Sequence, residues 1–133
     1  MADKEFSFWQ DHSPQYLEMA FRKDKEGRFR HPAGYGKRTG DCGDTVEIYL
    51  SVNKNIVEEI AYQVNGCINT NACTNAMIQM IENKNVDEAW AISPEMVAEY
   101  LETLPKNHKH CAELAVGALY RALADYNKKS GLD

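Results

Sequence analysis

Alternating apolar and polar residues in the middle of the chain predict two paired β-strands. Apolar residues occupy every second position of residues 46–52, which predicts a strand that buries one face: Val46, Ile48, Leu50 and Val52. A polar turn at 53–55 and a second strand-like run over 56–64 follow, and Asn65-Gly66 ends that run. The segment 25–44 carries five glycines and reads as a loop with one short strand at about 35–38.

A helical period of apolar residues replaces this alternation elsewhere in the chain. Ser13 and Pro14 are typical of a helix start and predict a helix over about 14–23. Further helices are predicted over about 71–81, 86–91, 94–104 and 109–127. Together these elements predict an α+β fold, in which about five helices pack against a small three-stranded antiparallel sheet in a single domain over residues 1–133. The aromatic residues before the first helix are expected to form an arm on the core: Phe6, Phe8 and Trp9.

Composition and charge narrow the classes of partner. The formal net charge is -5, and the charges are interspersed without a basic face, so nucleic acid is not an expected partner. No apolar run approaches the roughly 20 residues that span a bilayer, and the first ten residues lack the apolar segment of a signal peptide, so we expect a cytoplasmic protein without a membrane partner. In a reducing compartment, four cysteines are more typical of metal or thiolate chemistry than of disulfides.

Three of the cysteines fall at the ends of predicted elements. Cys42 lies in the glycine loop, Cys67 follows the second strand, and Cys111 lies in the first turn of the last helix. Element ends are where a fold gathers distant residues into a site, and helix N-termini favour a thiolate. Asp44 and His110 are adjacent potential ligands. Three thiolates with a carboxylate or an imidazole could bind zinc or the irons of a cluster.

The fourth cysteine, Cys73, lies on the apolar side of its predicted helix. Its spacing favours core packing, although its closeness to Cys67 also makes it a candidate additional ligand. Among the histidines, His108 is expected to be solvated or to hydrogen-bond to a ligand. His12 and His31 are expected at the surface because their surroundings are polar and loop-like.

The segments GDCGDTVEIYLSV, NGC and LPKNHKHCAELA, in this order and spacing, resemble the IscU/NifU-type scaffold proteins of iron-sulfur cluster assembly. The resemblance extends from the N-terminal helix to ALADY, near the end of the chain. It implies an α+β fold with three cysteines clustered at one exposed tip. It also implies a scaffold and not an enzyme: the chain would accept sulfur from a cysteine desulfurase, assemble a labile cluster with iron, and transfer it to apo-proteins.

The same resemblance assigns residues by position. It implies Cys42, Cys67 and Cys111 as cluster ligands, with Asp44 beside the cluster and His110 as the family's histidine. Cys111 is the expected sulfur acceptor. The implied cargo is an iron-sulfur cluster, [2Fe-2S] in the first place and [4Fe-4S] otherwise, and zinc is expected to bind the same thiolates in purified protein. A homodimer is a candidate assembly.

The segment before Cys111 departs from part of this family. Members that engage a dedicated heat-shock chaperone carry LPPVK before HC, whereas this chain has LPKNHKHC, with His108 in place of their lysine. The resemblance therefore does not imply that chaperone as a partner. The interval from Cys67 to Cys111 also lacks the long insertion of the SufU-type zinc-dependent sulfur acceptors, which favours a scaffold. A SufU-type sulfur acceptor or sulfurtransferase and a structural zinc protein stay open as alternatives.

Overall fold

The computed structural model describes residues 7–131. In chain order the elements are α1 (Phe8–Asp11), α2 (Pro14–Phe21), β1 (Gly34–Thr39), β2 (Thr45–Asn53), β3 (Ile56–Asn65), α3 (Ile68–Ile81), α4 (Val86–Trp90), α5 (Pro94–Leu101), the 3-10 helix η1 (Lys106–His108) and α6 (Lys109–Ser130). The described strands form one antiparallel sheet in the order β1-β2-β3. The predicted α+β fold with a three-stranded antiparallel sheet is therefore confirmed. No helix within residues 7–131 has both the length and the apolar character that crossing a membrane requires.

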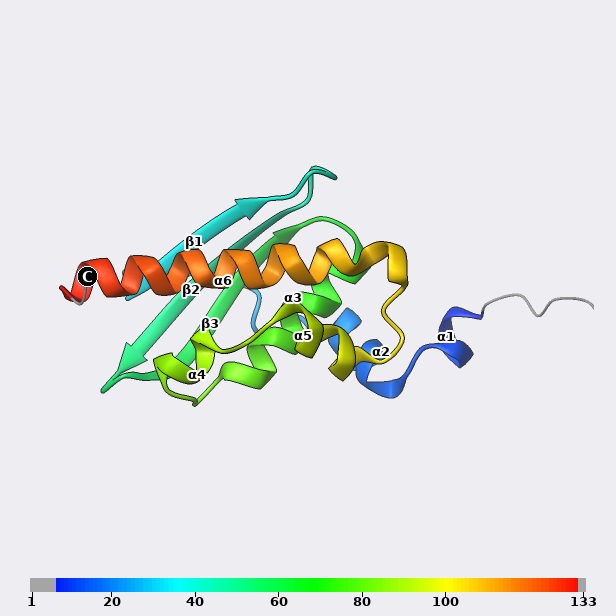
Figure 1. Ribbon diagram of the computed structural model, residues 1–133, viewed down its shortest axis with the longest axis horizontal. Coiled ribbons are helices and arrows are strands. Elements are labelled where there is room, and N and C mark those ends of the chain that lie inside the picture. Colours follow the sequence, from blue (N-terminus) through cyan, green and yellow to red (C-terminus); the bar gives the residue numbers. More distant parts are fainter. Residues whose placement is uncertain (1–6, 132–133) are drawn as a thin grey trace, which may run out of the picture.

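The core lies between the sheet and the helices on one of its faces. Figure 1 shows α6 running across the sheet, with α3 and α5 beside it, and α6 contacts β1, β2, α3 and α5. The alternation predicted for β2 is confirmed, because Val46, Ile48 and Leu50 are fully buried against these helices. On the opposite face, Tyr49 is also largely buried, because its ring packs against Tyr35 at a centroid distance of 5.0 Å.

Strand β1 is rich in glycine because α6 lies directly on it. Gly34 and Gly36 pair with Leu50 and Ile48 of β2 and face the helix on the core side. A Cβ atom at Gly36 would collide with the backbone of α6, at the carbonyl oxygen of Ala118 and the amide of Ala122. The short strand predicted at 35–38 is thus confirmed and extends one residue further at each end. Its glycines allow the backbone of α6 to lie close to the strand, and they do not mark a loop.

Helix α3 begins at Ile68, three residues before the predicted start, with Cys67 at its N-cap. The apolar period does not reveal this first turn because its buried residues are polar. Asn69 accepts a hydrogen bond from the Tyr16 hydroxyl over 2.6 Å, and the hydroxyl of the fully buried Thr70 donates to a carboxylate described below. Satisfied polar groups can be buried in this way without a large penalty.

Helix α5 ends earlier than predicted, at Leu101 instead of about 104. Glu102 adopts a left-handed backbone conformation (φ 64°) while its N–H still bonds to the Ala98 carbonyl, so the chain turns away from the helix there. The residues that follow form η1, whose last residue, His108, immediately precedes α6. This early stop places η1 where it can direct His108 toward the start of α6.

The predicted aromatic arm is confirmed only in part. Phe8 is half-buried against the core, as expected. Trp9 is 68% exposed and stacks on Phe21, itself 48% exposed, at a centroid distance of 5.4 Å, so the expectation that Trp9 packs on the core is wrong. Phe6 lies outside the described residues.

The expectation that His12 lies at the surface is also wrong. His12 is only 7% exposed, and its ring stacks on Tyr16 at a centroid distance of 3.7 Å. Its Nδ1 atom lies 2.7 Å from the Thr103 hydroxyl. Burial lowers the pKa of His12, because desolvation disfavours the charged imidazolium. His31 is exposed, as expected.

We predict that Gly36→Ala will lower the free energy of unfolding by about 1–3 kcal/mol, because the added methyl group must push α6 away from β1. Urea denaturation measures this loss. Gly40→Ala is the matched control, since its Cβ would meet the Leu114 side chain at 3.5 Å and Cys42 Sγ at 3.8 Å, which are ordinary contact distances. Equal stability of the Gly36→Ala variant and the wild type would contradict the direct contact of α6 with β1.

Candidate metal centre

The candidate site lies where β2 begins, β3 ends and two helices start. Thr45 pairs with Asn65 in the sheet, so the residues before β2 lie beside those after β3. This pairing brings the carboxylate of Asp44 to the first turn of α3, where its Oδ2 atom accepts a hydrogen bond from the Cys67 N–H over 3.2 Å. Gly66 allows this approach, because a Cβ there would lie 2.5 Å from the same oxygen.

Thr70 lies at the centre of this site, although it belongs to none of the cysteine motifs in the sequence. Its hydroxyl is 2.7 Å from Asp44 Oδ2, 3.4 Å from Cys111 Sγ and 3.6 Å from Cys67 Sγ. A hydroxyl has a single proton, so it donates to one acceptor at a time, and the short bond to the charged carboxylate is the strongest of these contacts. The spacing of three residues between Cys67 and Thr70 on one helix is the signal that could have identified Thr70.

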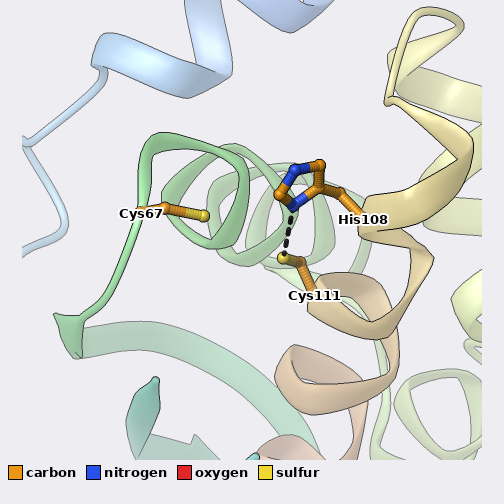
Figure 2. A group of neighbouring side chains, drawn as sticks. All are labelled: Cys67, His108 and Cys111. Atoms are coloured by element: carbon orange, nitrogen blue, oxygen red, sulfur yellow. Dashed lines mark hydrogen bonds between the residues drawn. The ribbon is translucent and has the colours of Figure 1, made fainter. Parts of the chain in front are cut away.

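Cys67, His108 and Cys111 come together from three elements. The two sulfur atoms and an imidazole nitrogen all lie within 4.8 Å of one another, and His108 Nδ1 is 4.0 Å from Cys111 Sγ. Figure 2 shows the three side chains pointing toward one another from the start of α3, the end of η1 and the start of α6. Within residues 7–131, this is the group of cysteine, histidine or carboxylate side chains close enough to hold one metal ion.

Burial lowers the acidity of Cys73 and Cys111. Burial raises the pKa of Cys111 to about 11, although the hydrogen bond from Thr70 opposes this increase. Without a cation, Cys111 is therefore a thiol, and desolvation outweighs the helix N-terminus that the sequence analysis had emphasised. Burial also raises the pKa of the Cys73 thiol strongly, and Cys73 lies fully buried in the core cluster. Its role as an additional ligand stays a prediction.

The other predicted ligands lie beside this group. Cys42 and His110 are exposed and line an open pocket of about 460 Å³, which also includes Arg38 and Glu113. Asp44 connects the two parts of the site. The pKa of its carboxyl group is lowered mainly by the hydrogen bond from Thr70 and, to a smaller extent, by the Cys67 backbone N–H and the thiols of Cys42 and Cys67.

Comparison with known proteins places the chain in a family. The family model described as "NifU-like N terminal domain" matches residues 25–133. The chain belongs to the NifU-like N-terminal domain family. The resemblance inferred from the cysteine segments is therefore confirmed.

Curated relatives of this NifU-like chain are named as scaffold proteins. The iron-sulfur cluster assembly scaffold protein IscU 1 of Archaeoglobus fulgidus is 41% identical over 90 residues, which cover 68% of this chain and 59% of the relative. The iron-sulfur cluster assembly scaffold protein IscU of Escherichia coli K12 is 36% identical over 89 residues, which cover 66% of this chain and 69% of the relative. The match thus spans less than two thirds of the length of the archaeal relative.

Solved structures of NifU-like and SufU proteins share the fold. The N-terminal part of a nitrogen-fixing NifU-like protein from Brucella abortus superposes with a TM-score of 0.71 at 18% identity, covering 88% of this chain and 94% of the other. FiSufU from Fervidobacterium islandicum AW-1 gives a TM-score of 0.72 at 19% identity, covering 84% and 95%. At these identities the structures establish the fold of this NifU-like chain.

We predict that Thr70→Val will raise the pKa of the Asp44 carboxyl group toward its ordinary value, because the variant lacks the hydroxyl that lowers this pKa most. Carbon-detected NMR titration of the Asp44 carboxyl group measures the change. A lowered carboxyl pKa stabilises the fold above the unfolded-state pKa, and this contribution is lost as the pH falls through the folded-state pKa. The variant should therefore lose less stability than wild type below about pH 4.

Thr74→Val is the control, since the Thr74 hydroxyl is also buried but donates to the Thr70 carbonyl, 2.8 Å away and one turn along the helix. An unchanged Asp44 titration in the Thr70→Val variant would show that Thr70 does not hold the carboxylate.

Proposed function

We propose that this chain is a scaffold on which a labile iron-sulfur cluster is assembled and from which the cluster is transferred to apo-proteins. One observation carries this proposal: the Cys67 and Cys111 thiols converge with an imidazole beside Asp44 and the exposed Cys42, at one end of the fold. Membership of the NifU-like N-terminal domain family, and the scaffold names of its relatives, support the same function. Such a protein binds and transfers its cargo without enzymatic turnover.

The proposed ligands are Cys42, Cys67 and Cys111, with Asp44 and His110 as weaker oxygen and nitrogen donors. The cluster is cargo and not a resident cofactor, so the site must release it. A cluster held by three thiolates and one weaker donor is released more readily than one held by four thiolates. The buried Cys73 would raise the number of thiolates to four, and its place in the core argues for packing instead.

Sulfur would be accepted at the same end of the molecule. Cys111 is the proposed acceptor, but it is buried, so the first turn of α6 must open before a partner's persulfide can reach its sulfur atom. Cys42 and Cys67 are exposed and can react without this change. We infer a cysteine desulfurase as the sulfur donor and apo iron-sulfur proteins as recipients, in the cytoplasm, with a homodimer as a candidate assembly.

A zinc-dependent sulfur acceptor of the SufU type is the second candidate function. The Cys67–His108–Cys111 group favours it, because two thiolates and one imidazole are a common ligand set for zinc. In that case the bound ion would organise the site and a single cysteine would carry sulfur. Zinc in purified protein would fit both functions, so its presence alone does not separate them.

We predict that anaerobic incubation of the apo-protein with ferrous iron, cysteine, a cysteine desulfurase and dithiothreitol, which reduces the delivered sulfur to sulfide, will produce the visible charge-transfer absorption of an iron-sulfur cluster. Iron and sulfide analysis with Mössbauer spectroscopy identifies the cluster, for which we propose [2Fe-2S]. The Cys73→Ser variant should bind the same amount of iron. A colourless protein that holds one tightly bound zinc ion under these conditions would favour the sulfur acceptor over the scaffold.

Asp44→Ala is expected to slow transfer of the assembled cluster to an apo-ferredoxin by about tenfold and to stabilise the cluster on the scaffold, because the labile oxygen donor is lost. The rate is followed by the absorption and circular dichroism of the recipient's cluster. Asp41→Ala removes an exposed carboxylate from the same loop and should leave the rate unchanged. If the Asp44→Ala variant transfers its cluster at the wild-type rate, Asp44 does not promote release.

A further inference from the structure

Two histidines flank the start of α6, and only one of them faces the thiols. His108 is half-buried, with Nδ1 4.0 Å from Cys111 Sγ, whereas His110 is exposed and lines the pocket beside Cys42. Their ring centroids are 5.6 Å apart. The helical backbone explains the difference, because side chains three residues apart share a helix face and adjacent side chains do not. His108 therefore faces Cys111 although His110 is its sequence neighbour.

The distances in this group are close to those that a tetrahedral ion requires. Ligand bonds of about 2.3 Å to sulfur and about 2.0 Å to nitrogen, at the tetrahedral angle, separate two sulfur ligands by about 3.8 Å and a sulfur from a nitrogen by about 3.5 Å. The three ligand atoms of Cys67, His108 and Cys111 lie within 4.8 Å of one another. Two sulfur atoms therefore need to approach by at most about 1 Å, and a sulfur and a nitrogen by at most about 1.3 Å, which small side-chain rotations supply.

We propose that Cys67, His108 and Cys111 bind a single divalent transition-metal ion, of the class of Zn²⁺, Fe²⁺ or Co²⁺, with His108 and not His110 as the nitrogen ligand. Two thiolates and one imidazole suit these ions. The ion replaces the two thiol protons, which are released, and the resulting complex of a dication, two thiolates and a neutral imidazole carries no net charge. That neutrality favours binding at the buried Cys111. The fourth position is left for a neutral oxygen donor such as water, since coordination by the Asp44 carboxylate would give the complex one negative charge.

The exposed Cys42 stays outside the coordination shell of this ion. Cys42 is not among the ligand atoms that lie within 4.8 Å of one another; its thiol contacts Asp44, and it lines the same pocket as His110. A loaded site would therefore hold metal on Cys67 and Cys111 while keeping one thiol free for a sulfur-donating partner. This consequence for sulfur rests on the proposed function, whereas the metal site itself does not, because it requires neither a desulfurase nor a cluster.

Titration of the reduced apo-protein with Co²⁺ tests the ligand set under anaerobic conditions. One equivalent should produce the ligand-field bands of a tetrahedral ion and sulfur-to-cobalt charge transfer. His108→Ala should weaken binding by at least about tenfold. His110→Ala is the matched control, an imidazole removed two residues away, and it should change the affinity by less than about threefold, as should Cys42→Ser. Far-ultraviolet circular dichroism verifies that each variant is folded.

Alkylation of the wild-type protein gives a second measurement that needs no variant. With one equivalent of Co²⁺ bound, iodoacetamide should modify Cys42 at the rate seen in the apo-protein, while Cys67 is protected. Peptide mass spectrometry measures the extent of alkylation at each of these two cysteines. The proposal is overturned if His110→Ala or Cys42→Ser weakens binding as much as His108→Ala, if the ion protects Cys42, or if one equivalent of Co²⁺ does not bind. Failure of cluster assembly in the wild type would count against the scaffold function alone.

Discussion

The bond between Asp44 and the first turn of α3 is the constraint on which the whole site depends. Asp44 belongs to the loop before β2, yet its carboxylate accepts hydrogen bonds from the Thr70 hydroxyl and the Cys67 N–H. It thereby joins a glycine-containing loop to the start of a buried helix. Because the Thr70 hydroxyl also touches both Cys67 and Cys111, the same carboxylate indirectly positions sulfur atoms that are far apart in the sequence. Loss of this bond would free the Cys42 loop from the other thiols.

The second half of the site is positioned by the contact of α6 with the sheet. The glycines of β1 let the helix backbone lie against the strand, and two side chains fix its position along it: Arg38 donates to the Glu113 carbonyl over 3.0 Å, and Arg121 donates to the Lys37 carbonyl over 2.7 Å. A helix held along its length presents its first turn at a defined place. Cys111 therefore meets the Thr70 hydroxyl, which also contacts Cys67.

The spacing of apolar residues and the positions of turn residues were sufficient to predict the sheet and most of the helices. The alternation over 46–52 identified β2, because Val46, Ile48 and Leu50 on one face are fully buried, whereas Tyr49 is the one buried side chain of that strand on the other face. The start of α3 was misplaced for the opposite reason: its first turn buries Asn69 and Thr70, and a period computed from apolar residues does not detect satisfied polar ones. His12 was misplaced in the same way, since its ring packs on Tyr16 although its sequence neighbours are polar.

The sequence was sufficient to expect the cysteines and Asp44 close together, but not to find Thr70 or to show which histidine faces the sulfur atoms. Chain order and element ends identified Cys42, Cys67, Cys111 and Asp44 as neighbours, whereas the choice between the histidines depended on where the last helix and its preceding 3-10 turn begin. With η1 and α6 in place, the spacing of three residues from His108 to Cys111 decides which imidazole faces the sulfur atoms.

The position of His108, three residues before Cys111, also affects which surface residues a chaperone could recognise. His108 stands where the chaperone-engaging relatives carry a lysine, and in this chain that position is half-buried and turned toward the thiols. A side chain committed to the interior of the site is less available for recognition at the surface. Three positions of the LPPVK segment differ in this chain, at Lys106, Asn107 and His108, and of these three side chains it is His108 that joins the group with Cys67 and Cys111.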